Sequence, residues 1–178
     1  MSRKFRDGEV RDFWDLKDFP VPKGRKIRDI IDSVLMRRGY IGEVSITAYG
    51  EKDPEDNPLE NGITFVHRRD KYWRLNKILV DFALAAADNH EPHLVQLTLM
   101  VVAENIKKDT EFFHLLRNVN SIRFNVLLVV PDVCHPEEVP LPFVSLAWRW
   151  TDLLQGGDPM PETELLALLD RGKQEFIW

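Results

Sequence analysis

Leu97-Thr98-Leu99-Met100-Val101-Val102-Ala103, a nearly continuous apolar run, is the strongest sequence signal for the fold class. Thr98 is its only polar residue, and so apolar a run is typical of a central strand covered on both faces, as strands of parallel sheets are. A second run, Phe124-Asn125-Val126-Leu127-Leu128-Val129-Val130, has the same character and ends at Pro131. The two runs predict a buried sheet between layers of helices.

Strand-like and helix-like segments alternate on either side of these runs. Apolar residues at i, i+3, i+4, i+7 and i+8 from Ile27 to Leu35 predict a helix that ends before Gly39. This alternation predicts an α/β three-layer sandwich with a mostly parallel sheet, in which ligands bind outside the carboxyl ends of the strands. The other expected strands cover residues 9–16, 43–49, 63–67 and 144–148, and the other expected helices cover 75–89, 109–119 and 162–170.

The bulk composition is that of an ordinary globular protein. The 178 residues are most simply one domain, 44% hydrophobic and 30% charged. A single cysteine, Cys134, excludes an intrachain disulfide and favours a reducing intracellular compartment, either cytoplasm or nucleus, with an organelle left open. We expect no membrane association, because no segment approaches the roughly 18 apolar residues of a span. The net charge of −5 predicts no global attraction to nucleic acid.

Three acidic residues adjoin apolar runs, where a carboxylate is costly to desolvate without a partner. Asp15 and Glu104 lie at the carboxyl ends of predicted strands, and Asp81 lies within a predicted helix. Mg²⁺ is held in proteins by one or two carboxylates, with water and substrate phosphate completing its shell. The three acids therefore suggest a shared cation. The alternative is that Asp15 caps a turn and that Asp81 lies on a polar helix stripe, paired with Lys77 at i,i+4.

A basic and aromatic stretch, His67-Arg68-Arg69-Asp70-Lys71-Tyr72-Trp73-Arg74, precedes that helix. Tyr72 and Trp73 could stack on unpaired bases while the arginines contact phosphates. The alternative is that the two rings pack this loop onto the domain. Other signals are weaker, because the five histidines form no tight ligand set and the sequence holds neither a phosphate-binding P-loop nor a Gly-x-Gly-x-x-Gly run.

Several of these motifs occur together in a known family. The opening motif Phe13-Trp14-Asp15-Leu16-Lys17-Asp18-Phe19-Pro20-Val21-Pro22-Lys23-Gly24 is followed by Val44–Gly50, by Lys77-Ile78-Leu79-Val80-Asp81 and by Leu146-Ala147-Trp148-Arg149-Trp150. In this order they resemble NYN domains of the limkain-b1/meiosis-regulator type, which are common in plants. The resemblance spans roughly residues 11 to 154 and includes the segments Phe112 to Arg117 and Phe124 to Leu128.

The resemblance implies a PIN-like, Rossmannoid fold and an endoribonuclease that depends on Mg²⁺ or Mn²⁺. By this resemblance Asp15 is the first metal ligand and Asp81 the second. Glu104 and Asp109 stand in for the two acids of the family's Ser-Gly-Asp-x-Asp-Phe motif. The expected organisation is an N-terminal arm (1–10), the NYN domain (11–155) and a C-terminal extension with a short helix (156–178).

The chain also departs from the family pattern. Lys17-Asp18 stands where Glu-Asn is usual, and Ala103-Glu104 replaces Gly-Asp before the lysines at 107 and 108. Two hypotheses follow: a metal-dependent endoribonuclease that cleaves single-stranded RNA, or a degenerate NYN domain that binds RNA or a protein. A receiver-like phosphoacceptor domain is a weaker third, because Val66-His67 offers no aspartate at a strand end. The residues expected to contact substrate are Arg68, Arg69, Tyr72, Trp73, Lys77 and Lys107.

Overall fold

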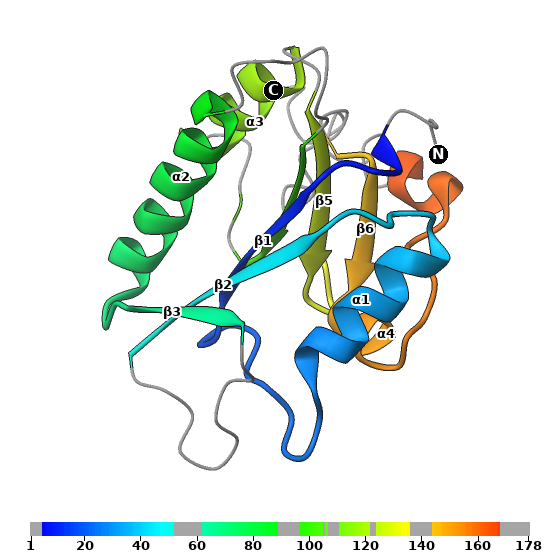
Figure 1. Ribbon diagram of the computed structural model, residues 1–178, viewed down its shortest axis with the longest axis horizontal. Coiled ribbons are helices and arrows are strands. Elements are labelled where there is room, and N and C mark those ends of the chain that lie inside the picture. The colour runs from blue at the N-terminus through cyan, green and yellow to red at the C-terminus, as the bar shows by residue number, and fades with distance from the viewer. Residues whose placement is uncertain are drawn as a thin grey trace, which may run out of the picture.

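A six-stranded, all-parallel sheet forms the centre of the computed structural model (Figure 1). The structure describes residues 5–51, 62–88, 97–104, 106, 111–121, 124–135 and 144–167. The strand order is β3-β2-β1-β4-β5-β6. The expectation of a mostly parallel α/β sandwich is confirmed, and the strand expected near residue 146 lies at one edge of the sheet. The elements are β1 (Val10–Asp15), α1 (Ile27–Arg37), β2 (Val44–Gly50), β3 (Ile63–His67), α2 (Lys71–Asp88), β4 (Thr98–Val102), α3 (Glu111–Ser121), β5 (Asn125–Val130), β6 (Leu146–Arg149) and α4 (Trp150–Leu154).

The helices cover both faces of the sheet, which gives three layers. Figure 1 shows α1 and α4 on one face and α2 and α3 on the other. Strand side chains alternate between the two cores, as the pleat requires. In β1, Phe13 belongs to the core under α2 and α3, whereas Val10 and Trp14 belong to the core under α1 and α4. Asp15 shares the face of Phe13 and therefore points toward α2.

Helix α2 begins at Lys71, four residues before the start expected at Leu75, so that expectation was wrong. The reason is Asp70, whose Oδ1 accepts hydrogen bonds from the backbone N–H groups of Tyr72 (2.8 Å) and Trp73 (3.4 Å). An aspartate in this position caps a helix by satisfying its free N–H groups. Half of the basic and aromatic stretch is thus helix rather than loop.

The segments beyond the sheet pack against it where the structure describes them. Arg6 accepts a backbone hydrogen bond from Ile41 at 2.8 Å, and Met160 donates one to Ala147 at 2.7 Å. Met160 and Leu165 are buried in the core under α2 and α3. Residues 162–167 are helical, as expected, and the remainder of the helix expected to reach 170 lies outside the described residues. None of the described helices is long and apolar enough to cross a membrane.

Candidate functional site

Asp15, the last residue of β1, forms a buried ion pair with Arg74 of α2. Its carboxylate is fully buried, and the Nε of Arg74 donates to Oδ1 at 2.9 Å and to Oδ2 at 3.0 Å. The backbone N–H of Lys17 donates to Oδ1 at 2.9 Å. Arg74 is itself buried, and its Nη1 donates to the carbonyl of Arg69 at 2.7 Å. The first predicted metal ligand is therefore already paired with a cation of the chain.

A second cation, Lys71, links Asp15 to the end of β4. Its Nζ lies 3.4 Å from Oδ2 of Asp15 and forms a close ion pair with Oδ2 of Asp18. The same Asp18 oxygen accepts the backbone N–H of Glu104 at 2.9 Å. The ends of β1 and β4 and the first turn of α2 thus converge on one ammonium group. Asp15 and Asp18 belong to this site through their carboxylates and Glu104 through its backbone N–H, as neighbouring strand ends in a parallel sheet predict.

Asp81 lies seven residues further along α2 than Arg74. It accepts a hydrogen bond from the hydroxyl of Tyr49 at 2.7 Å and pairs with Lys77, the i,i+4 pair expected as the alternative to metal binding. Arg74 and Asp81 are two helical turns apart, which places them about 10.5 Å from each other along the helix axis. Burial, together with the hydrogen bond and charge of Asp81, raises the pKa of Tyr49 well above its ordinary value. The side chain of Asp81 is thus held by Tyr49 and Lys77, and Tyr49 lies beside Asp15 in the register of β1 and β2.

The donor set around Asp15 does not fit a divalent cation. Mg²⁺ requires carboxylate oxygens that are open to it, whereas Arg74 and Lys71 contact both oxygens of Asp15. No three His, Cys, Asp or Glu side chains within the described segments are grouped so that they could hold a metal ion. Asp109 and Lys107 lie outside those segments. The four-acid ligand set stays a prediction.

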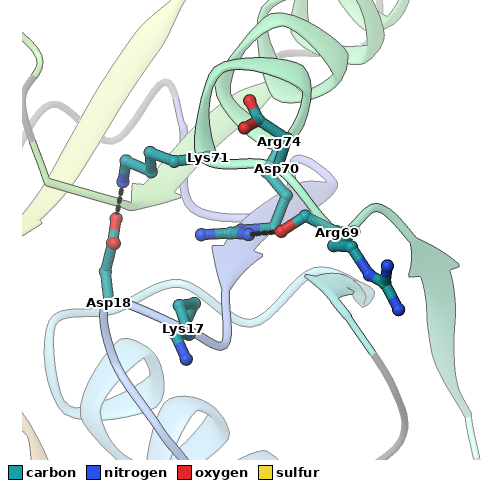
Figure 2. Close-up of a pocket in the computed structure, with 6 residues that line it drawn as sticks. All are labelled: Lys17, Asp18, Arg69, Asp70, Lys71 and Arg74. Carbon is teal, nitrogen blue, oxygen red and sulfur yellow. Dashed lines mark hydrogen bonds and ion pairs between the residues drawn. The ribbon is translucent and has the colours of Figure 1, made fainter.

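A pocket of about 470 Å³ opens beside this ion pair, at the start of α2 (Figure 2). Figure 2 shows the ammonium of Lys71 against the carboxylate of Asp18, and the guanidinium of Arg74 against the carbonyl of Arg69. Cations outnumber acids in the lining, and each of the buried acids nearby already has a cationic partner. An anionic ligand therefore suits the pocket better than a cationic one. The lining residues are Lys17, Asp18, Arg69, Asp70, Lys71 and Arg74.

Two aromatic rings stand in solvent on the first turn of α2, on the residues between the pocket-lining Lys71 and Arg74. Tyr72 is 67% exposed and Trp73 is 62% exposed, and their ring centroids lie 5.5 Å apart in an edge-to-face arrangement. The alternative that these rings pack the segment onto the domain is therefore wrong. Rings of this size expose a large apolar surface to water, so stacking on a flat ligand would bury that surface and is favourable.

The remaining predicted contact residues divide between the pocket and its surroundings. Arg69 lines the pocket and forms an exposed ion pair with Glu51 at 3.1 Å. Arg68 is exposed just before the pocket and donates from Nη1 to the carbonyl of His67 at 2.7 Å. Lys77 is occupied by Asp81 and does not line the pocket. The sequence-based list thus contained Arg69 and omitted Lys17, Lys71 and Arg74.

One further buried carboxyl was not singled out from the sequence. Asp12 lies in the middle of β1, opposite Ile46 of β2 and Met100 of β4, in the apolar core under α1. Neither of its carboxyl oxygens has a hydrogen-bond partner of good geometry among the residues described. Burial raises the pKa of Asp12 to about 8, and the nearby backbone N–H of Phe13 offsets only part of this effect. Asp12 is therefore protonated in the folded protein at neutral pH.

No family model matches this sequence, and no curated protein matches it either. The family resemblance therefore rests on the motifs alone.

Proposed function

We propose that this chain binds single-stranded RNA in the pocket at the start of α2 and does not cleave it, as a degenerate relative of NYN domains. The observation that carries the proposal is the buried ion pair between Asp15 and Arg74, next to a pocket lined with cations. The choice of RNA as ligand rests on the motif resemblance. The absence of cleavage rests on the pairing of Asp15.

The surroundings of the pocket supply the two interactions that unpaired nucleic acid requires. Lys17 and Arg69 are exposed cations at its rim, within reach of phosphate oxygens. Tyr72 and Trp73 present exposed rings on the first turn of the same helix, and bases stack on such rings with little regard to sequence. The arrangement favours flexible single strands, because their bases can leave the stack and lie on the rings.

Retained cleavage would require a different arrangement of the acids. To bind Mg²⁺, the carboxylate of Asp15 would have to give up its contacts with the cations that now donate to it. These cations are Lys71 and the buried Arg74. Removing one partner of a buried ion pair costs several kcal/mol. We therefore place binding ahead of metal-dependent cleavage.

Fluorescence anisotropy with a short labelled single-stranded RNA, in EDTA and then in Mg²⁺, tests the proposal. We expect binding of equal affinity in both solutions and an intact RNA afterwards. Trp73→Ala should weaken binding by about 5-fold or more, since stacking contributes about 1–3 kcal/mol per base. Leu84→Ala is the matched control, because Leu84 is a similarly exposed apolar residue further along α2.

Two results would contradict the proposal. Cleavage that needs Mg²⁺ or Mn²⁺ and is lost in Asp81→Asn would establish the endoribonuclease instead. A failure to bind single-stranded RNA, or equal losses in Trp73→Ala and Leu84→Ala, would remove the pocket from consideration and leave a protein partner as the next hypothesis.

A further inference from the structure

We infer that the ammonium group of Lys71 is a built-in substitute for a divalent cation, so that the site works without metal and excludes one. The inference deepens the proposed function, because it concerns the same site and explains why RNA binding should not depend on Mg²⁺. It rests on the contacts of Lys71 with two carboxylates and on the way in which α2 holds this residue.

The ammonium group of Lys71 lies between two carboxylates, where a metal ion would be expected. Nζ of Lys71 contacts Oδ2 of both Asp15 and Asp18, two carboxylates from the end of β1. The side chain of Asp15 is fully buried and that of Asp18, which lines the pocket, is 9% exposed, so both oxygens are largely shielded from solvent. A cation that bridges two carboxylates at a strand end occupies the place where a metal would bind.

The charge balance of this cluster also disfavours a divalent ion. Asp15 and Asp18 carry two negative charges, which the positive charges of Lys71 and Arg74 offset within the same cluster. A divalent ion added to this cluster would meet two cations at close range and no uncompensated acid among the two carboxylates. Repulsion between like charges is strong in a partly buried site, because little water screens it.

The backbone of Lys71 is fixed by the capped start of α2, which holds its side chain at the two carboxylates. Lys71 is the first residue of α2, directly after Asp70, whose carboxylate caps the next two N–H groups. Asp70 also accepts the backbone N–H of Arg74 through its carbonyl at 3.0 Å. The first helical turn therefore presents Lys71 and Arg74, at i and i+3, to the same carboxylate. The hydrogen bonds of Asp70 fix the start of α2, and the helix backbone therefore holds both cations in position against Asp15.

A Mn²⁺ titration followed by electron paramagnetic resonance tests this inference without RNA. We expect no saturable binding to the unmodified protein. Lys71→Met keeps the length of the apolar stem and removes the charge, so it should bind one Mn²⁺ at least about tenfold more tightly than the unmodified protein. Lys77→Met is the matched control, because Lys77 is equally exposed (32% against 34%) and also pairs with an aspartate of its neighbourhood. It should behave like the unmodified protein.

Two outcomes overturn the inference: no gain of Mn²⁺ affinity in folded Lys71→Met, or tight Mn²⁺ binding by the unmodified protein. If Lys71→Met does not fold, the melting temperature of the unmodified protein decides, and a rise on addition of Mn²⁺ is the contradicting result. Failure of RNA binding would refute the proposed function and leave the Mn²⁺ result standing. The two ideas are thereby tested separately.

Discussion

Replacement of Asp12 by asparagine should stabilise the protein, and the gain should grow with pH. The folded state keeps Asp12 protonated up to about pH 8, whereas an unfolded chain ionises it near 3.8. Between these two values the folded state binds one proton more than the unfolded state. The free energy of unfolding therefore decreases as pH rises through this window, by about 1.4 kcal/mol per pH unit. Below 3.8 and above about 8 this residue contributes no slope.

The structure sets the size of the effect. At about pH 7 the cost of keeping Asp12 protonated amounts to about 4 kcal/mol, a large share of the stability of a typical domain. Asparagine has the same shape and carries no charge at any pH. Relative to the unmodified protein, Asp12→Asn should therefore gain about 3 kcal/mol between about pH 5 and about pH 7.

Urea denaturation followed by tryptophan fluorescence at these two pH values measures the gain. Asp12→Leu serves as an internal control, because it lacks the titrating group as well. Its absolute stability will differ from that of Asp12→Asn, but the two variants should change with pH in parallel. A constant difference between Asp12→Asn and the unmodified protein at both pH values would refute the reasoning, since it would mean that Asp12 does not take up a proton on folding.

Three further predictions concern other contacts. Arg74→Met should lower the free energy of unfolding by about 3–5 kcal/mol in urea denaturation, because among the described residues it leaves the buried Asp15 with Lys71 as its remaining ion-pair partner. A loss no larger than that of exposed Arg69→Met would contradict this. Gly42→Ala should lower the free energy of unfolding by more than about 1 kcal/mol, since an added Cβ would lie 2.0 Å from the carbonyl oxygen of Gly8. An unchanged urea midpoint would contradict this and show that the segment around Gly8 moves aside without cost. Tyr49 should contribute no phenolate absorbance when the folded protein is titrated to alkaline pH, because burial and Asp81 raise its pKa. A smaller phenolate signal in Tyr49→Phe than in the unmodified protein would disprove this.

The fold was largely predictable because its signals are local. Residues 97–103 and 124–130 are apolar on both faces, and only a sheet covered on both sides accommodates such strands. The predicted start of α2 is four residues late because Asp70 caps the helix and is not part of a loop, and an aspartate followed by helix-forming residues is a capping signal.

The site was predictable only in part, because its contacts are long-range. Arg74 and Asp15 are 59 residues apart in the chain, and their pairing depends on where α2 docks on the sheet. Periodicity does not fix that docking. Asp12 differs in this respect, since it alternates with Val10 and Trp14 along β1 and its burial could have been expected from the strand pattern.

The central position of β1 has a consequence for the order in which the protein assembles during synthesis. Val10 lies opposite Val44 of β2 on one side and opposite Thr98 of β4 on the other. As the chain leaves the ribosome, β2 and β3 can pair with β1 long before β4 exists. The second edge of β1 then stays open until the segment ending at Val102 has emerged, and an open apolar edge recruits other chains. Nascent chains of this protein should therefore depend on chaperones most during the synthesis of the residues between β3 and β4.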